Sequence, residues 1–348
     1  MPSIRIITET GNKESRCKIA EALISIQRKN FVRNQIMFNE NLPQGNDALL
    51  FNDVKCNVAG LFLYSNILID VMKIIECKFE VKLPITEIYG SLPVKWNSGR
   101  LLLSKYEIQD DIKKEFLLLH DNHITPVLTF SNPLLHKSDL NDTLCNKLLE
   151  YVAENDGIVI ISSDLLHEYI TRNYPSIKIE SSIIRTALSD VARTADYYNN
   201  LSKEFYKYVI HVDDNYNFLL LSEINKENAE IILNERCFNL CKIRKEHYLN
   251  IANEQISQSN ENYQNNNFLK ACHAIPERKQ LYSKKRNISM TLEEYKKIYS
   301  LGFRNFKIQG RTNSIHTNIF DLLRFTLEPN IAFSQAYPIV SEYIDEVQ

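Results

Sequence analysis

The chain has 348 residues, of which 44% are hydrophobic and 24% are charged, so it can bury a substantial core in one large domain or two ordinary ones. Its formal net charge of −2 gives no overall field that would draw it to DNA or to anionic lipid. No leader-like segment opens the sequence, and no apolar run reaches the roughly 18 residues of a membrane span, so we expect a cytoplasmic protein with no membrane partner.

The first 80 residues are expected to form an N-terminal α/β cap or small appended region. They contain a possible strand, "IRIIT", a helix-like "KIAEALISIQRKNFV", and the apolar run "VAGLFLYSNILIDVMKIIE". Their role stays open at this point. Residues 81–348 would then form the main domain, with a surface loop rich in asparagine at about 253–268, where few apolar anchors are found.

Runs rich in β-branched and aromatic residues alternate with amphipathic helical patterns in the main domain. A larger gap before the last run leaves room for one more strand near "RNISM", residues 286–290. Eight strand–helix units favour a (β/α)8 TIM-like barrel over an open sheet. The seven clear runs are "ITEIYGS" from Ile85, "TPVLTFSN" from Thr125, "GIVIISS" from Gly157, "IKIESSI" from Ile177, "YKYVIHV" from Tyr206, "AEIILNE" from Ala229 and "FKIQG" from Phe306.

The last unit has clear boundaries. Thr291 and Glu294 make a capping box, a helix is expected over 292–301, and Gly302 stands where a left-handed glycine would end it. In a barrel, the residues that follow a strand line the active face, so Gly310 is expected to let backbone approach a ligand beside Lys307.

Three cysteines follow the sixth run. Cys237 and Cys241 come directly after it, and Cys272 returns beyond the asparagine-rich loop. They could hold an iron–sulfur cluster, or a zinc ion completed by His247 or His273, or they could be packed thiols without a metal. An odd number of cysteines, spread through a large chain, argues against a disulfide framework.

These motifs resemble the U32 peptidase-like family of barrel proteins. "FKIQGR" is similar to the "KIEGR" signature of that family, and "YGSLP", "LTFSN" and "LNERCFNLCKIRKEHY" look like counterparts in a little-described bacterial branch. The resemblance covers about residues 85–325. It implies a (β/α)8 barrel, a four-cysteine [4Fe–4S] cluster, and oxygen-independent hydroxylation of RNA bases or of a quinone precursor; RNA enters as a partner through this resemblance alone.

The chain departs from the family pattern in two ways. Only Cys237, Cys241 and Cys272 match the cluster ligands, so the fourth position would be filled by His247, by His273, by a substrate atom or by nothing. Gln309 stands where the signature has an acidic residue, which removes a carboxylate from the expected site.

Polar residues at the ends of predicted strands are the other candidates. Three carboxylates on separate strands could perform acid–base chemistry, if their surroundings move their pKa values apart. Many strand-end polar residues are also ordinary helix caps. The catalytic candidates are Glu87, Glu180 and Glu235, and the substrate-binding candidates are Tyr89, Arg100, Asn132, Asn234, Lys307 and Arg311.

Three functions follow. The first is an iron–sulfur-dependent modifying enzyme. The second is a metal-independent or zinc-stapled barrel that binds a small polar or anionic ligand. The third is a non-catalytic module that binds a partner. A classical peptidase is disfavoured, because no Ser/His/Asp order, HExxH or reactive Cys–His pair supports it.

Overall fold

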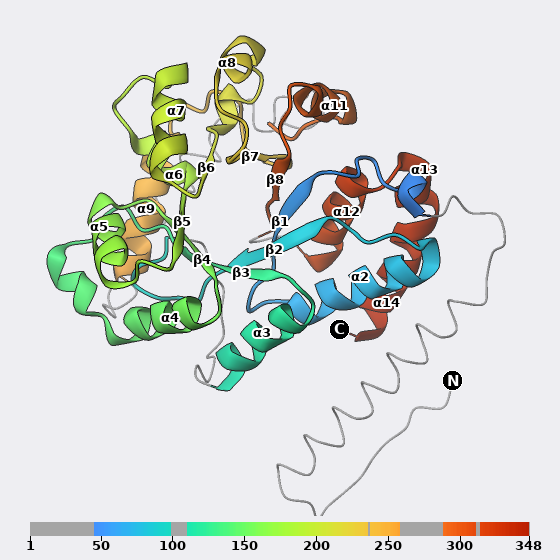
Figure 1. Ribbon diagram of the computed structural model, residues 1–348, viewed down its shortest axis with the longest axis horizontal. Helices are drawn as coiled ribbons and strands as arrows, with labels where there is room; N and C mark the ends of the chain where they lie inside the picture. Colours follow the sequence, from blue (N-terminus) through green and yellow to red (C-terminus); the bar gives the residue numbers. More distant parts are fainter. Residues whose placement is uncertain (1–44, 99–109, 236, 258–287, 311–313, 348) are drawn as a thin grey trace, which may run out of the picture.

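The computed structural model describes residues 45–98, 110–235, 237–257, 288–310 and 314–347 (Figure 1). The start of the expected N-terminal cap and most of the asparagine-rich loop lie outside these ranges. Within them no helix is long and apolar enough to cross a membrane.

Eight strands form one closed barrel. Each strand pairs in parallel with the next, and β8 returns to pair with β1. The fold is therefore the TIM-like barrel that the alternating pattern predicts. The strands are β1 (Lys55–Ala59), β2 (Ile85–Gly90), β3 (Thr125–Phe130), β4 (Ile158–Ile161), β5 (Lys178–Ser181), β6 (Lys207–Val209), β7 (Ala229–Ile232) and β8 (Asn305–Ile308).

The barrel begins earlier in the chain than predicted. All seven clear runs are strands, but the eighth strand is β1, which lies inside the region expected to be a cap. Residues 288–290 carry no strand, so the expectation of one at 286–290 is wrong where the structure describes it. The sequence hides β1 because it is only five residues long, has Asn57 at its centre, and runs into an apolar stretch that continues as a helix.

Helices surround the barrel (Figure 1). Three of the helices that follow a strand are capped by serine, with Ser163, Ser182 and Ser314 each accepting a backbone N–H. The helices are η1 (Gly45–Ala48), α2 (Ser65–Phe79), α3 (Asp110–Asp121), η2 (Lys137–Asn141), α4 (Thr143–Glu154), α5 (Asp164–Asn173), α6 (Ile183–Leu188), α7 (Ala195–Glu204), η3 (Val212–Asp214), α8 (Phe218–Glu223), α9 (Arg244–Ser257), α11 (Leu292–Ser300), α12 (Ile315–Thr326), α13 (Pro329–Ile331), η5 (Ala332–Ala336) and α14 (Tyr337–Val347).

The last strand–helix unit is built as the sequence predicts. The Thr291–Glu294 capping box is present, and α11 ends before Gly302, whose φ of +102° lies in the left-handed region. The turn brings the chain directly into β8 and so fixes the position of Lys307.

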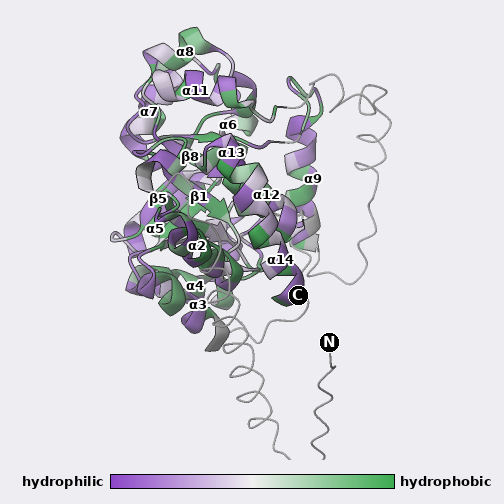
Figure 2. Cartoon of the chain, turned by 90° about the vertical axis from the view of Figure 1, so that its right-hand side faces the viewer, coloured by the Kyte–Doolittle hydropathy of each residue, from purple (hydrophilic) through white to green (hydrophobic). Residues whose placement is uncertain are grey.

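The core lies between the strands and the apolar faces of the helices, which show both hydrophobic and hydrophilic stretches in Figure 2. Cys56 and Val58 of β1 belong to this outer core, whereas Ala59 and Tyr89 belong to a small cluster inside the barrel. Adjacent strand residues therefore point to opposite sides of the wall.

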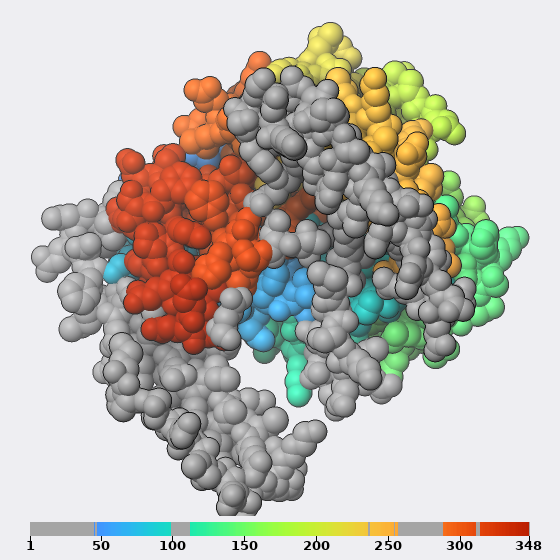
Figure 3. Space-filling model, turned by 180° about the vertical axis from the view of Figure 1, so that it is seen from behind, coloured from blue at the N-terminus to red at the C-terminus, as the bar shows by residue number. Residues whose placement is uncertain are grey.

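The C-terminal helices close the seam between the first and last strands. In Figure 3 they form the red part of the surface, seen from behind. The Tyr343 hydroxyl of α14 contacts the Asp70 carboxylate of α2. The last helix is thus attached, outside the sheet, to the helix that follows the first strand.

Candidate functional site: a buried ion cluster beneath the barrel mouth

Five charged side chains lie inside the barrel. All five are less than one-tenth exposed, although charged groups are rarely buried unless they are paired. Each stands in a short strand among apolar neighbours, and the alternation of the strand directs it inward. The ion cluster consists of Glu87 of β2, Glu180 of β5, Lys207 of β6, Glu230 of β7 and Lys307 of β8.

Lys307 pairs with two of the carboxylates. Its Nζ donates to Glu180 Oε1 at 2.6 Å and to Glu230 Oε2 at 2.8 Å. The Glu180 bond reaches across the barrel between strands that are not neighbours. Two charge-assisted bonds hold the ammonium, and one of its three N–H groups is left for another acceptor.

Lys207 pairs with Glu87, the carboxylate that is not bonded to Lys307. Its Nζ contacts Glu87 and lies 3.3 Å from Glu230 Oε1 and 3.5 Å from Glu180 Oε2. Asn57 Nδ2 donates a further hydrogen bond to Glu230 Oε1 at 3.2 Å. All three carboxylates therefore have an ammonium partner.

The charges balance when one carboxyl is protonated, because three carboxylates face two ammonium groups. Burial and the neighbouring Glu230 raise the pKa of Glu180 to about 7. Burial also acts to raise the pKa of Glu230, but Lys207 and Lys307 outweigh it and bring that pKa down to about 2. The carboxylates raise the pKa of Lys307 despite its burial, so it is an ammonium ion. Glu180 is therefore the carboxyl group of the cluster that exchanges a proton near neutral pH.

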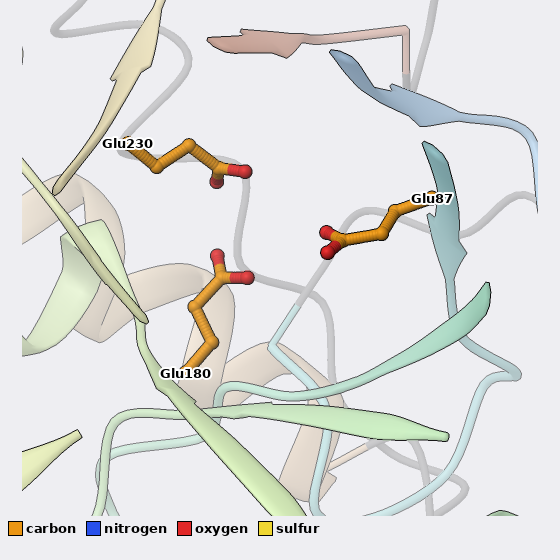
Figure 4. Close-up of side chains that lie close together, drawn as sticks. All are labelled: Glu87, Glu180 and Glu230. Carbon is orange, nitrogen blue, oxygen red and sulfur yellow. The ribbon is translucent and has the colours of Figure 1, made fainter. Parts of the chain in front are cut away.

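The three carboxylates point toward one another from separate strands (Figure 4). Their nearest oxygens all lie within 4.8 Å of one another, a spacing at which they could hold a metal ion. Lys207 and Lys307 already provide the counter-charge there. A divalent cation added to the cluster would turn a buried charge near zero into an excess of positive charge, which is costly in a low-dielectric interior.

A small pocket opens above the cluster, at the carboxyl ends of the strands. Ser182 and Gln309, which directly follow β5 and β8, contribute to its lining and so place it at the barrel mouth. Its volume is about 20 Å³, which is room for about one water molecule. Its other lining residues are Ile160, Ile183, Val209, Ile232, Tyr89 and Lys307.

Tyr89 and Lys307 are the polar side chains shared by the pocket and the barrel interior. The Lys307 Nζ lies 4.6 Å from the centre of the Tyr89 ring, and the Tyr89 hydroxyl donates to the Ile308 carbonyl at 3.4 Å. The ring holds the ammonium from one side without consuming a hydrogen-bond donor. Both residues are among the predicted substrate-binding residues.

Glu235 lies at the rim, apart from the carboxylates with which it was grouped. Its Oε1 accepts the Cys237 N–H at 2.9 Å, and its Oε2 accepts Gln309 Nε2 at 3.1 Å. The structure thus brings Glu87 and Glu180 together with Glu230, which lies in β7 five residues before Glu235.

Asn132 and Asn234, the two asparagines among the predicted substrate-binding residues, form hydrogen bonds with the backbone of loops. Asn234 exchanges hydrogen bonds with the backbone of Gln309 at 2.7 and 2.6 Å, and also donates to Asp321. Asn132 donates to the Lys95 carbonyl at 3.1 Å and accepts the Leu134 N–H at 2.9 Å. Their side-chain atoms are thus engaged by the protein itself. Arg100 and Arg311 lie outside the described residues.

Gly310 has a packing role. A Cβ at this position would lie 2.4 to 2.6 Å from the Asn318 side chain of α12, and the Asn318 amide donates to the Gly310 carbonyl at 3.0 Å. The structure therefore explains the glycine by the close approach of a neighbouring helix, and the approach of a ligand to Gly310 stays a prediction.

The expected cysteine site is described only in part, because Cys272 lies outside the described residues. Cys237 and Cys241 are free thiols, and each is partly exposed. Burial raises the pKa of Cys237 to about 12, despite the opposing effect of Arg244. Cys237, Cys241 and His247 do not form a three-ligand group, so the described residues do not by themselves fit a cluster or a zinc ion.

Lys207 and Glu230 are the members of the ion cluster that inspection of strand ends missed. The signal that could have found them is a charged residue within a short apolar strand, as in "KYV" and "AEII". The same signal marks Glu87, Glu180 and Lys307.

Comparison with known proteins adds a resemblance in fold. No family model matches the sequence, and no curated protein is similar to it. A solved structure described as "The Structure of the U32 Peptidase Mk0906" is similar over 78% of this chain and 94% of that chain, with 12% identity and a TM-score of 0.47. This likeness concerns the fold, and the functional argument rests on this chain's own residues.

Proposed function

We propose that this chain is a metal-independent barrel enzyme, in which Lys307 and Glu180 act together as a proton donor to a small polar or anionic ligand at the barrel mouth. One observation carries the proposal. The Lys307 ammonium lines the pocket and is hydrogen-bonded, at 2.6 Å, to a carboxyl group whose pKa is near 7.

Lys307 is the group that would touch the ligand. Its remaining N–H can donate to a ligand oxygen, since Glu180 and Glu230 occupy the other two. Because its pKa is raised, Lys307 serves as an acid and hydrogen-bond donor rather than as an amine nucleophile.

Glu180 would restore the proton. When water or buffer base removes a proton next to the ligand carbonyl and negative charge builds on its oxygen, Lys307 gives up a proton to that oxygen. The neutral amine then turns its lone pair toward Glu180 and takes the proton of the Glu180 carboxyl group. The products are a protonated ligand oxygen, the same ammonium, and an ionised Glu180. Solvent protons then recharge Glu180 at neutral pH, where its pKa makes both states accessible.

The other charged residues would be positioning residues. Glu230 fixes the Lys307 ammonium and is itself held by Lys207 and Asn57. Glu87 contacts Lys207 and does not touch Lys307 in any described hydrogen bond. These contacts hold the Lys307 ammonium in place before the ligand arrives.

Solvent exchange measures this activity without knowledge of the natural substrate. A panel of small oxo compounds in D₂O, with pyruvate and 2-oxobutyrate among them, is followed by NMR for loss of the hydrogens next to the carbonyl. Exchange faster than buffer is expected for the wild type, should disappear in Lys307→Met, and should fall in Glu180→Gln. Exchange at the buffer rate across the panel, or full activity in Lys307→Met, would contradict the proposal.

The family resemblance supports a second candidate, an iron–sulfur-dependent modifying enzyme acting on RNA or a small molecule. Its ligands would be Cys237, Cys241 and Cys272, with His247 in the fourth position. Iron and sulfide analysis of protein purified without oxygen tests it. Near-stoichiometric iron and sulfide that Cys237→Ala loses would favour this candidate over the metal-independent one.

A further inference from the structure

We propose that α9 is a lid over the pocket at the barrel mouth, and that Tyr248 is the side chain that holds it closed. This inference concerns access to the site and rests on the proposed function, in which a ligand meets Lys307. The pocket has room for about one water molecule. A larger ligand can therefore reach Lys307 only when an element that covers the pocket moves away.

α9 crosses the carboxyl ends of the strands. At its first residue, the Arg244 guanidinium donates at 3.2 Å to Asp213, which lies in the turn after β6. Toward its other end, the Ala252 carbonyl accepts the side-chain amide of Asn132, which follows β3, at 3.4 Å. Between these points α9 contacts α6, the helix after β5. Figure 2 shows α9 standing apart from the strands. It therefore lies across the mouth of the barrel.

Tyr248 connects α9 to the walls of the pocket. It packs against a buried apolar cluster to which Ile183, Val209 and Ile232 belong. The same three residues line the pocket. Val209 and Ile232 end strands β6 and β7, and Ile183 begins α6, so the barrel fixes their backbone. The tyrosine of α9 can leave this apolar group without the movement of any strand.

Little buried apolar surface holds α9 to the barrel. Among the side chains of α9 that the structure describes, Ala252 is the one buried apolar residue, although the helix has 14 residues. The shorter helix α4 has 12 residues and buries Cys145, Leu148, Leu149 and Val152. Elements with few buried apolar contacts open locally at a lower free energy than the rest of a protein. Opening of α9 should therefore precede unfolding of the barrel.

The two ends of α9 are anchored unequally. Arg244 is buried, and its guanidinium donates both to Asp213 and to the Phe238 carbonyl. The Ala252 carbonyl has only the long bond from Asn132, whose amide also donates to two loop carbonyls. α9 should therefore swing about its Arg244 end. Its closure over a bound ligand would keep bulk water from the Lys307 ammonium.

Thiol labelling measures the opening of the lid without a known ligand. Val209→Cys places a thiol in the pocket wall of the full chain, and peptide mass spectrometry follows its modification by methyl methanethiosulfonate separately from the native cysteines. We expect slow labelling, with a rate that rises with urea much less steeply than global unfolding does. Labelling of Val209→Cys/Tyr248→Ala should be at least about tenfold faster, because burial of the ring no longer opposes opening.

Two other tyrosine changes, each combined with Val209→Cys, are the controls. Tyr248→Phe keeps the ring and should leave the labelling rate unchanged. Tyr151→Ala removes a partly buried tyrosine from α4, which packs on the outer core, and should also leave the rate unchanged. If Tyr248→Ala does not fold, the urea dependence of labelling in Val209→Cys alone decides.

Three outcomes would overturn the lid. The first is an equal labelling rate with and without the Tyr248 ring. The second is labelling of Val209→Cys with the full urea dependence of global unfolding, because the pocket would then open only when the barrel unfolds. The third is labelling as fast as that of the exposed Cys77, which would show that nothing covers the pocket. The proposed function can fail separately, because solvent exchange of oxo compounds tests it.

Discussion

Lys307 of β8 and Glu180 of β5 are joined by a 2.6 Å hydrogen bond across the inside of the barrel. The two residues are not on neighbouring strands, so the bond depends on closure of the whole sheet. Their charges, and those of the three groups around them, govern three measurable properties, and a fourth prediction concerns packing at Gly310.

The first prediction concerns the pH dependence of stability. The folded-state pKa of Glu180, about 7, is above its usual value of 4.5, so the folded protein holds more protons than the unfolded chain between these pH values. Stability should therefore fall by about 3 kcal/mol as the pH rises from 4.5 to 7, and this contribution should be constant above pH 7. Urea unfolding at a series of pH values measures the slope.

Glu180→Gln is the control for that slope. It removes the titrating group and should flatten the dependence between pH 4.5 and 7. The loss of stability at lower pH should persist, because the pKa of Glu230 is depressed to about 2 and its contribution is lost as the pH falls from 4.5 toward that value. An unchanged slope in Glu180→Gln would show that another group carries it.

The second prediction is that Lys307 and Glu180 are energetically coupled. Lys307→Met leaves buried carboxylates short of counter-charge and should cost about 3 to 5 kcal/mol of unfolding free energy at pH 8. Adding Glu180→Gln removes one of those charges, so the double variant should be more stable than the sum of the single effects by about 0.5 to 3 kcal/mol. Urea unfolding of the four proteins completes the cycle.

Lys296→Met is a matched control for this cycle, because Lys296 is exposed on α11. Its effect should stay within about 0.5 kcal/mol. Strict additivity of Lys307→Met and Glu180→Gln would argue against a direct interaction.

The third prediction is that removal of both lysines creates a metal site. In Lys207→Met/Lys307→Met the three carboxylates keep oxygens within 4.8 Å of one another but lose both counter-ions. A divalent cation should then supply the charge and raise the melting temperature of the variant, or restore folding if the variant is unfolded without it. Thermal unfolding with and without Mg²⁺, Ca²⁺ or Mn²⁺ is the measurement.

The wild type is the control for this effect, and its melting temperature should change much less with the same cations. A double variant that responds to no cation would show that the carboxylates move apart without the lysines.

The fourth prediction separates packing from ligand binding at Gly310. Gly310→Ala should destabilise the protein by about 1 to 3 kcal/mol, since its Cβ meets the Asn318 side chain at 2.4 to 2.6 Å. Gly310→Ala/Asn318→Ala should recover part of that loss in thermal unfolding. A Gly310→Ala variant with normal stability would contradict the packing role.

The sequence predicted the fold well where strands follow the general rule for parallel sheets. Seven strands could be recognised in the sequence because both of their faces are buried and their residues are mostly apolar. β1 did not, because Asn57 interrupts it and only pairing with β2 and β8 defines it. Such pairing is a property of the closed barrel and cannot be seen in five residues.

The candidate site was predicted in part for a related reason. Glu87, Glu180, Lys307 and Tyr89 were identified, although as strand-end residues. Lys207 and Glu230 were missed, because a rule that looks just beyond a strand passes over charges within it. That these charges neutralise one another depends on distances across the barrel, and no local pattern in the sequence reports those distances.

The ion cluster also sets an order on the maturation of the chain. Its members are spread from residue 87 to residue 307, and Lys307 lies in the strand that closes the barrel. During synthesis all three carboxylates and Lys207 leave the ribosome before Lys307 does. Until the last strand is made, three acidic groups face one ammonium group. Their excess negative charge favours an incomplete barrel whose interior is still in contact with water. Closure of the sheet and neutralisation of its interior are thus completed by the same short segment.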